Sequence, residues 1–211
     1  MSIGIYVMRH GAKETGVDND LARLTKEGCA QVKRSAANNL VDVQFSALYC
    51  SEKFRALQTI ACAVSVLPER NNGLGIKAEI GFDYTGAPDL EQYGWMSKEV
   101  AMVATSSGQQ PTVAMWMETA PAMIAFLRER FTKTLLAVAH YEHVGVVGGR
   151  DIRSISAINI LIASHSPVAE LACMEPENTP MLHEADIMKY TIDVYTREMV
   201  ITDVKYIPRG F

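Results

Sequence analysis

The chain has 211 residues and a formal net charge of -4 at pH 7, with a sequence pI near 5.7, so it offers no basic field for a nucleic acid backbone. Hydrophobic residues make up 48% of it, which supports a buried core, but its apolar runs are far shorter than a membrane span. The length fits one large α/β domain, and no Pro-, Ser- or Gly-rich linker divides it. We therefore expect a single domain over residues 1–211, without a nucleic acid or a membrane as partner.

The cysteines indicate a reducing environment. All four are widely separated in the chain, without the close pairs that are typical of metal sites and disulfide frameworks; they are Cys29, Cys50, Cys62 and Cys173. We interpret them as buried free thiols. The apolar start of the chain also runs straight into charged residues and not into the cleavage site of a secretory signal, so the sequence predicts a cytoplasmic protein.

The first predicted element is a strand that ends at Arg9. Its β-branched and apolar residues, from Ile5 onward, indicate a central position in a parallel sheet, where both faces are covered. Ligands bind at the carboxyl ends of such strands, and this one is followed by His10 and Gly11. The guanidinium of Arg9 suits a phosphate or carboxylate, and Gly11 lets the backbone approach a ligand closely. Between them, a neutral imidazole of His10 could attack phosphorus.

A polar loop and a helix follow. Residues 12–23 are charged and contain glycine, which predicts a loop over the end of the first strand. Thr25 is placed to cap a helix, with Glu27 in the first turn. Apolar residues then recur at helical spacing and predict the face that packs on the sheet: Cys29, Val32, Ala36 and Leu40.

A second strand over residues 45–50 leads into a second helix, for which Ser51 is the expected cap. We expect this helix to bury a stripe made of Phe54, Leu57, Ala61, Val64 and Leu67. Arg55 falls outside that stripe, one turn from the helix start. It therefore repeats the position of Arg9 near the carboxyl end of a strand.

The middle of the chain is less regular. Residues 76–82 predict a third strand, and residues 83–96 an irregular segment that covers the site. A helix is predicted over residues 119–131, with Pro121 in its first turn, and the helical pattern breaks at residues 145–150.

The strongest late strand is predicted over residues 158–164 and ends at His165. Ser166 can cap a following helical segment and Pro167 suits its first position, so backbone N–H groups would face the same ligand as His165. Residues 188–195 and 199–207 alternate as expected for a terminal hairpin.

These strand ends predict a convergent site, because parallel strands place their carboxyl ends at one edge of the sheet. Arg9, His10, Arg55 and His165 would meet there and could bind and transfer a phosphoryl group. Residues 135–139 could form a rival strand that ends at His140, but we favour His165 because its strand is longer and a helix start follows it.

The remaining histidines are given structural interpretations. His140 and His143 could suggest a metal pair, but no third ligand has suitable spacing, and no metal is expected. With Glu142 they are interpreted as polar residues of a long helix, and His183 as a loop residue.

The motifs resemble the histidine phosphatase superfamily, which includes phosphoglycerate mutases and acid phosphatases. The resemblance rests on Arg9–Gly11, Leu24–Gly28, Ser51–Thr59 and the late strand that ends in His165. It implies a three-layer α/β/α sandwich with a mostly parallel sheet, as in phosphoglycerate mutase. It also implies a phosphohistidine on His10, a phosphate pocket of Arg9, Arg55 and His165, and release of phosphate by water without a metal or other cofactor. Ser166, beside His165, is added to the expected phosphate contacts.

The resemblance further implies a carboxylic acid that protonates the leaving oxygen and then activates water. The family places it in a Leu-x-Glu segment before a Gly-containing turn, and this chain has no clean match. The candidates are Glu79, Asp83 and Glu91. We favour Asp83 because it directly follows the third predicted strand.

The predicted function is hydrolysis of a phosphomonoester, with a small phosphorylated molecule or a phosphoprotein as substrate. A mutase is the nearest alternative, but it would need a bound bisphosphate and extra basic groups, which the acidic segment 79–99 does not supply. The other alternative is a non-catalytic module that binds phosphate. Its interaction surface would be formed by Tyr84, Tyr93, Trp95 and Trp116, although these aromatic residues also suit ordinary packing.

Overall fold

The computed structural model describes residues 2–71, 73–149, 157–195 and 198–210. Its centre is a six-stranded sheet with the order β3-β2-β4-β1-β5-β6. The strands are β1 (Ser2–Arg9), β2 (Ala47–Cys50), β3 (Ile76–Ala78), β4 (Ile158–Ser164), β5 (Ile187–Val194) and β6 (Met199–Ile207). The first four run parallel, and β5 and β6 form an antiparallel hairpin on β1. The predictions of a mostly parallel sheet and of a terminal hairpin are confirmed.

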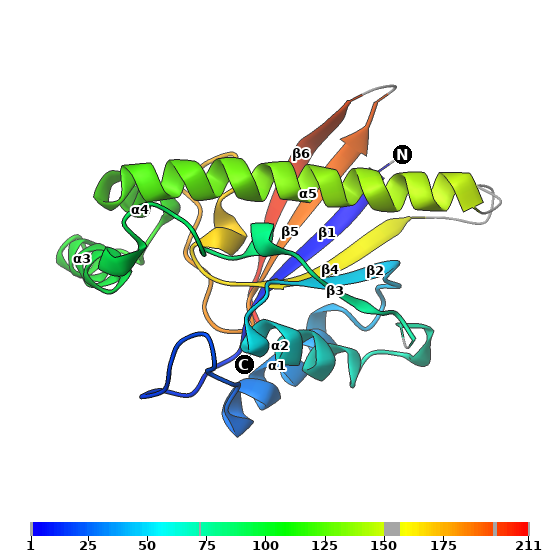
Figure 1. Cartoon of the computed structure of the whole chain (residues 1–211), viewed down its shortest axis with the longest axis horizontal. Coiled ribbons are helices and arrows are strands. Elements are labelled where there is room, and N and C mark those ends of the chain that lie inside the picture. Colours follow the sequence, from blue (N-terminus) through cyan, green and yellow to red (C-terminus); the bar gives the residue numbers. More distant parts are fainter. Residues whose placement is uncertain (1, 72, 150–156, 196–197, 211) are drawn as a thin grey trace.

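Helices cover both faces of the sheet. The α-helices are α1 (Lys26–Asn39), α2 (Phe54–Val64), α3 (Tyr93–Ser106), α4 (Val113–Thr119) and α5 (Pro121–Gly149). Short 3₁₀ turns are η1 (Glu69–Asn71), η2 (Ile80–Phe82), η3 (Leu90–Gln92) and η5 (Val168–Glu170). Figure 1 shows α1 and α2 on one face and the long α5 across the other, with α3 and α4 beyond one end of the sheet. The predicted three-layer α/β/α architecture is confirmed. No helix in these ranges is long and apolar enough to cross a membrane.

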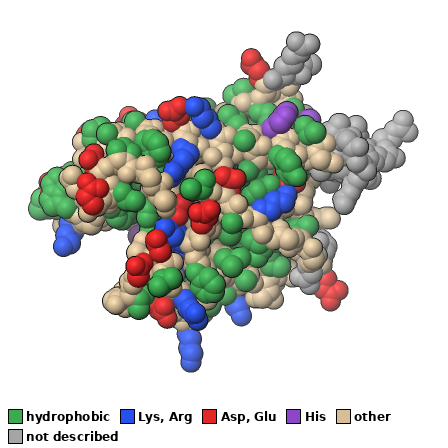
Figure 2. Space-filling view, viewed as in Figure 1, with side chains coloured by type: hydrophobic (Ala, Val, Ile, Leu, Met, Phe, Trp, Pro, Cys, Tyr) green, Lys and Arg blue, Asp and Glu red, His purple; other side chains and the backbone are tan. Residues whose placement is uncertain are grey.

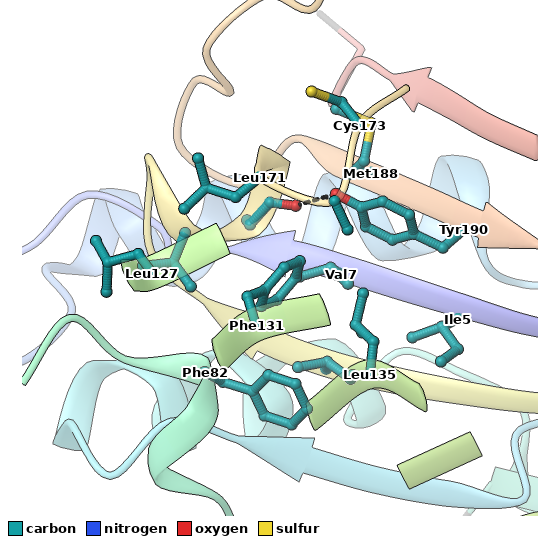
Figure 3. Packing of buried hydrophobic residues seen from close by; sticks show 14 of the residues in the cluster. Ile5, Val7, Phe82, Leu127, Phe131, Leu135, Leu171, Cys173, Met188 and Tyr190 are labelled. Atoms are coloured by element: carbon teal, nitrogen blue, oxygen red, sulfur yellow. Dashed lines mark hydrogen bonds between the residues drawn. The ribbon is translucent and has the colours of Figure 1, made fainter. Parts of the chain in front are cut away.

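The core under α5 fixes the loop that follows β4. Phe131 of α5 packs edge-on against Phe82 and Tyr190, with 6.0 Å between ring centroids in each pair (Figure 3). Tyr190 lies on β5, and its hydroxyl donates a 2.7 Å hydrogen bond to the carbonyl of Ala169 in η5. Because η5 begins at Val168, three residues after His165, this buried contact helps to hold the end of β4 in position.

The local expectations for the first helix hold. The hydroxyl of Thr25 accepts a 2.9 Å hydrogen bond from the N–H of Gly28, so Thr25 is the predicted N-cap of α1. Val32, Ala36 and Leu40 are buried beneath the sheet as expected, and Cys29 is half-buried.

The predicted buried stripe of α2 is wrong at its first three positions, whereas Val64 is half-buried and Leu67, beyond the helix end, is buried as predicted. Phe54 and Leu57 are 43% and 39% exposed, and Ala61 is exposed as well. The buried face is instead formed by Arg55, Ala56, Thr59, Ile60 and Ala63. The helix is rotated because the guanidinium of Arg55 finds polar partners inside the protein, so this charged residue belongs to the inner face.

Three boundaries in the middle of the chain also differ. The third strand ends at Ala78, and residues 80–82 form the 3₁₀ turn η2. The segment expected to be irregular up to residue 96 becomes helical at Tyr93. The last helix continues through Gly145 to Gly149, because an isolated glycine lowers helix stability without ending the helix. Arg150 lies outside the described residues.

Close backbone packing joins α1 to the loop after β1. A Cβ atom on Gly28 would lie 2.0 Å from the carbonyl oxygen of Ala12, and one on Gly11 would lie 2.3 Å from that of Gly28. Backbone atoms cannot move aside as a flexible side chain can. Gly28→Ala should therefore lower the free energy of unfolding by about 1–3 kcal/mol, as overpacking does.

Gly94→Ala in α3 is the matched control, because a Cβ there has no neighbour within 4 Å. It should raise the free energy of unfolding by about 0.5–1 kcal/mol through helix propensity. Urea unfolding measures both variants. Equal stability of Gly28→Ala and wild type would contradict the close packing.

Candidate active site

A cavity of about 670 Å³ lies where β1 and β4 end. The predicted phosphate-binding residues all line it; they are Arg9, His10, Arg55, His165 and Ser166. The adjacent register of Arg9 on β1 and Ser164 on β4 explains why His10 and His165 meet. Their rings lie 5.1 Å apart, centroid to centroid.

His10 has the geometry of an uncharged nucleophile. Its Nδ1 lies 2.8 Å from the carbonyl oxygen of Gly11, so Nδ1 carries the hydrogen and Nε2 keeps a free lone pair. Burial lowers the pKa of His10 to about 3, and the charges of Arg55 and Arg9 act in the same direction. The hydrogen bond to Gly11 acts against them and raises the pKa. The imidazole is therefore neutral at physiological pH.

His165 lies across the cavity, and it is held by Ser51. The Oγ of Ser51 lies 2.6 Å from Nε2 of His165, and Oδ1 of Asp83 lies 4.0 Å from the same nitrogen. With the hydroxyl donating to Nε2, Nδ1 carries a hydrogen that has no partner in the described part of the protein. Burial first, and then the nearby His10 and Arg55, lower the pKa of His165 well below its ordinary value.

His140, the alternative to His165 as the second histidine of the site, lies outside the cavity. It is exposed on α5 and is not among the residues that line the cavity. Its neighbour Glu142 binds Lys77 and the hydroxyl of Tyr49, each at 2.6 Å. The interpretation of this segment as part of a long helix is confirmed.

The two arginines approach the cavity from different elements. Arg55, at the start of α2, is 1% exposed and donates to the backbone oxygen of Asn19 and, at 2.9 Å, to the hydroxyl of Tyr84. Arg9 donates to the backbone oxygen of Leu182. The Nε–H of each arginine has no partner among the described residues.

The sequence analysis did not identify Lys53. Its ammonium group contacts Asp20 at 2.6 Å, Thr85 at 3.2 Å and Asp83 at 3.4 Å, and it lies 5.6 Å from the ring centre of Tyr84. Hydrogen bonds to Asp20 and the charge of Asp83 raise its pKa, although burial, the largest effect, acts the other way. The one signal in the sequence was its position two residues before Arg55.

The candidate acids occupy different places. Asp83 is fully buried behind Lys53, where its oxygens accept from the N–H of Tyr84 and the hydroxyl of Thr85, and it does not line the cavity. Glu79 lines a separate hollow beside Lys77, and Glu91 is exposed on η3. The carboxylates that do line the cavity are Asp20 and Glu184, both missed in the sequence because they lie in loops.

Two predicted helix caps are wrong. Ser51 turns toward His165, and α2 begins without a side-chain cap at Lys53. Ser166 donates instead to Glu170 at 2.6 Å, and only the three-residue turn η5 follows. The N–H of Ala169 bonds the carbonyl of His165, so the expected helix N-terminus does not offer this group to an anion.

Residues 5–75 match the sequence model of the histidine phosphatase superfamily (branch 1). This stretch contains Arg9, His10 and Arg55. The resemblance to the superfamily is confirmed. No curated protein sequence matches the chain.

Solved structures of that superfamily share the fold. The protein histidine phosphatase SixA, complexed with tungstate, has 17% identity and a TM-score of 0.52, covering 98% of this chain and 97% of that one. Phosphoglycerate mutase from Bacillus anthracis has 14% identity and a TM-score of 0.58, covering 95% and 92%. The α-ribazole phosphatase from Shigella flexneri has 18% identity and a TM-score of 0.53, covering 99% and 96%. At this identity the likeness establishes a phosphoglycerate mutase-like fold, and the activity is argued from the cavity itself.

The buried histidines should make stability depend on pH. Because the pKa values of His10 and His165 are lowered, the unfolded chain binds more protons than the folded one below about pH 6.5. Their contribution to stability is present above pH 6.5 and is lost on acidification. Glu170 has the opposite effect on the pH dependence of stability. Burial raises its pKa to about 7, so its contribution to the free energy of unfolding is lost as the pH rises through 7.

Between pH 4.5 and 6.5 the two histidines outweigh Glu170. Glu170→Gln should therefore steepen the loss of unfolding free energy on acidification by about 1.4 kcal/mol per pH unit relative to wild type. Urea unfolding at pH 5 and 6 measures the slope, and His140→Gln, at an exposed site, should leave it unchanged. A shallower slope for Glu170→Gln would contradict the assigned protonation.

Proposed function

We propose that this protein is a phosphatase that hydrolyses a phosphomonoester through a phosphohistidine on His10. The observation that carries the proposal is the neutral imidazole of His10, whose free Nε2 lies in a cavity with Arg9, Arg55 and His165. Histidine is an effective nucleophile in this state, and the two arginines stabilise the charge of the transferring group.

The cavity suits a dianion. Its lining carries four cationic side chains, which are Arg9, Lys13, Lys53 and Arg55. Two carboxylates oppose them, Asp20 and Glu184, so two positive charges remain in excess. A phosphomonoester carries nearly two negative charges at neutral pH.

The reaction proceeds in two steps. Nε2 of His10 forms a bond to phosphorus while the bond from phosphorus to the leaving oxygen breaks, and that oxygen takes a proton. Water then attacks the phosphohistidine, the phosphorus–nitrogen bond breaks, and inorganic phosphate leaves. Arg9, Arg55 and His165 line the cavity, and we assign these three side chains to the non-transferred oxygens.

We assign the proton transfer to Asp20, and we assign to Asp83 the positioning of Lys53. Asp20 lines the cavity, and its neighbour Asn19 accepts a hydrogen bond from Arg55, so the carboxyl lies beside the phosphate-binding arm. Asp83 does not line the cavity, but its carboxylate contacts Lys53 and Thr85, which do, and lies 4.0 Å from Nε2 of His165.

Leaving-group dependence tests this assignment. Asp20→Asn should slow hydrolysis of an alkyl phosphate by about 100-fold, because the alkoxide needs a proton, and should affect p-nitrophenyl phosphate much less. Glu79→Gln is the matched control, because Glu79 lies outside the cavity. An equal loss of activity on both substrates would contradict the role of Asp20 as a general acid.

A second candidate is phosphoryl exchange of the mutase type. Lys13 lines the cavity, and it forms no ion pair with a carboxylate in the described residues, although Asn19 accepts a hydrogen bond from it. It therefore offers a positive charge to a second anionic group on a substrate.

The predicted aromatic residues give less support to a purely binding module than the cavity gives to a phosphatase. Tyr93 stacks on Tyr84 and on Trp116, with centroids 5.7 Å and 5.4 Å apart, and all three side chains are largely enclosed. Trp95 alone among the four predicted aromatic residues is well exposed, at 59%, and it belongs to α3. Hydrophobic side chains gather at the left of Figure 2, where α3 lies in Figure 1. The other three aromatic residues serve packing around the cavity.

Two assays on the wild-type protein distinguish these functions. We expect phosphate release from p-nitrophenyl phosphate, and no exchange of phosphate between the carbon positions of phosphoglycerate. Exchange without release would establish the mutase reaction. Phosphate binding with neither reaction would establish a binding module.

The protein is further proposed to act in the cytoplasm on a small phosphorylated molecule or a phosphoprotein. The proposal of a reducing location is supported by its four cysteines, all of which are free thiols.

A further inference from the structure

The structure brings two cysteines together that are far apart in the sequence. Cys29 lies in the first turns of α1 and Cys62 near the end of α2, and these helices pack side by side under the sheet (Figure 1). Their sulfur atoms are 3.1 Å apart, with the thiol of Cys62 donating to Sγ of Cys29. The sequence showed no close pair, because the pair forms only when the two helices dock.

We propose that Cys29 and Cys62 form a reversible disulfide in the folded protein, as a redox modification site separate from the phosphate cavity. Both thiols are half-buried, so a small oxidant can reach them, whereas Cys50 and Cys173 are buried. The contact between Cys62 and Cys29 is the one thiol–thiol hydrogen bond found among the described residues. The reactive pair is therefore distinguished by geometry from the other thiols of the chain.

The chemistry needs a small disulfide, such as oxidised glutathione, as oxidant. The thiolate of Cys29 attacks one sulfur of this disulfide, whose S–S bond breaks, and one glutathione leaves as a thiol. Cys62 then loses its proton, and its sulfur attacks Sγ of Cys29 and expels the second glutathione. Two protein thiols are oxidised to one disulfide, and one oxidised glutathione is reduced to two thiols.

The order of attack follows from the hydrogen bond. The thiol of Cys62 donates its hydrogen to Sγ of Cys29, and burial first and then this contact raise the pKa of Cys62 to about 11. Cys62 therefore acts as the resolving thiol. Because its deprotonation is unfavourable at neutral pH, the second step should become faster in mildly alkaline buffer.

The link would join two helices that support the site. Cys29 follows Gly28, whose backbone packs against Gly11, and Cys62 lies two turns after Arg55 on α2. A disulfide between them closes a loop of more than 30 residues and restricts the unfolded chain. We expect the oxidised protein to melt about 5–10 °C higher than the reduced protein.

Mass spectrometry of the full-length protein tests the proposal. After treatment with oxidised glutathione and alkylation under denaturing conditions, we expect two alkylated thiols in place of four, and a tryptic cross-link between residues 27–33 and 56–70. A reductant should break the cross-link. Cys29→Ser and Cys62→Ser should each abolish the cross-link, and Cys173→Ala should retain it.

Other results would overturn the proposal. Four alkylated thiols, or a stable mixed disulfide on Cys29 without a cross-link, would show that the two sulfur atoms do not react with each other. A cross-link that appears only after denaturation would show that it belongs to the unfolded chain. Because the assay reads thiols and not turnover, its outcome is independent of the proposed phosphatase activity.

Discussion

His10→Ala should reduce phosphate release from p-nitrophenyl phosphate by about a thousandfold or more. Both arginines, His165 and Lys53 stay in this variant, so the cavity can still bind the substrate. What it loses is Nε2 of His10, the atom that we propose accepts the phosphoryl group. The reaction should therefore fail at the chemical step, with kcat falling far more than KM changes.

A trapping experiment supplies the independent readout. Rapid quenching of the wild type with a ³²P-labelled substrate should yield an acid-labile, base-stable phosphoenzyme, mapped to the tryptic peptide that begins at His10. His10→Ala should yield none, and His140→Ala, at an exposed position on α5, should behave as wild type. Activity that survives the loss of His10 would exclude the phosphohistidine mechanism.

The sequence predicted the sheet and the convergence of strand ends because both depend on local patterns. Residues 158–164 are rich in isoleucine, whose β-branched side chain favours a buried strand, and parallel strands end at one edge. Arg9, His10 and His165 each directly follow or end such a strand. Their meeting in one cavity therefore required only the sheet order, which the structure supplies.

The rotation of α2 about its axis could not be predicted from a local sequence pattern. A hydrophobic pattern assigns Phe54 to the inside and Arg55 to the outside, whereas the structure does the reverse. Arg55 is buried because Asn19 and Tyr84, far away in the sequence, accept its hydrogen bonds. Such long-range polar contacts override the apolar periodicity of a helix.

The acid that we propose, Asp20, could not be identified in the sequence for the same reason. In the sequence, Asp20 is one of several charged residues of a predicted loop. Its contact with Lys53 joins residues that are 33 positions apart in the chain, so no local pattern indicates it. Asp83 follows the turn η2 and not β3, which ends at Ala78, and its side chain turns into the protein. A loop carboxylate becomes a candidate only once the fold shows which cavity it faces.

The second large effect is expected at Arg55. Arg55→Lys keeps the positive charge but loses the planar guanidinium that contacts Asn19 and Tyr84. We expect kcat/KM for p-nitrophenyl phosphate to fall about 100-fold in Arg55→Lys and about 1000-fold in Arg55→Ala, because an oxyanion donor in a buried site stabilises the transition state strongly.

Arg34→Ala is the matched control, since Arg34 is an exposed arginine of α1 paired with Glu27, and its loss should leave kcat/KM unchanged.

The inhibition constant of vanadate distinguishes a direct role of Arg55 from a structural one. If Arg55 contacts the transferring group, vanadate binding should weaken in parallel with kcat/KM across the two variants. Unchanged vanadate binding in Arg55→Ala would show instead that the arginine only anchors the loop at Asn19, and the phosphate pocket would then rest on Arg9 and His165.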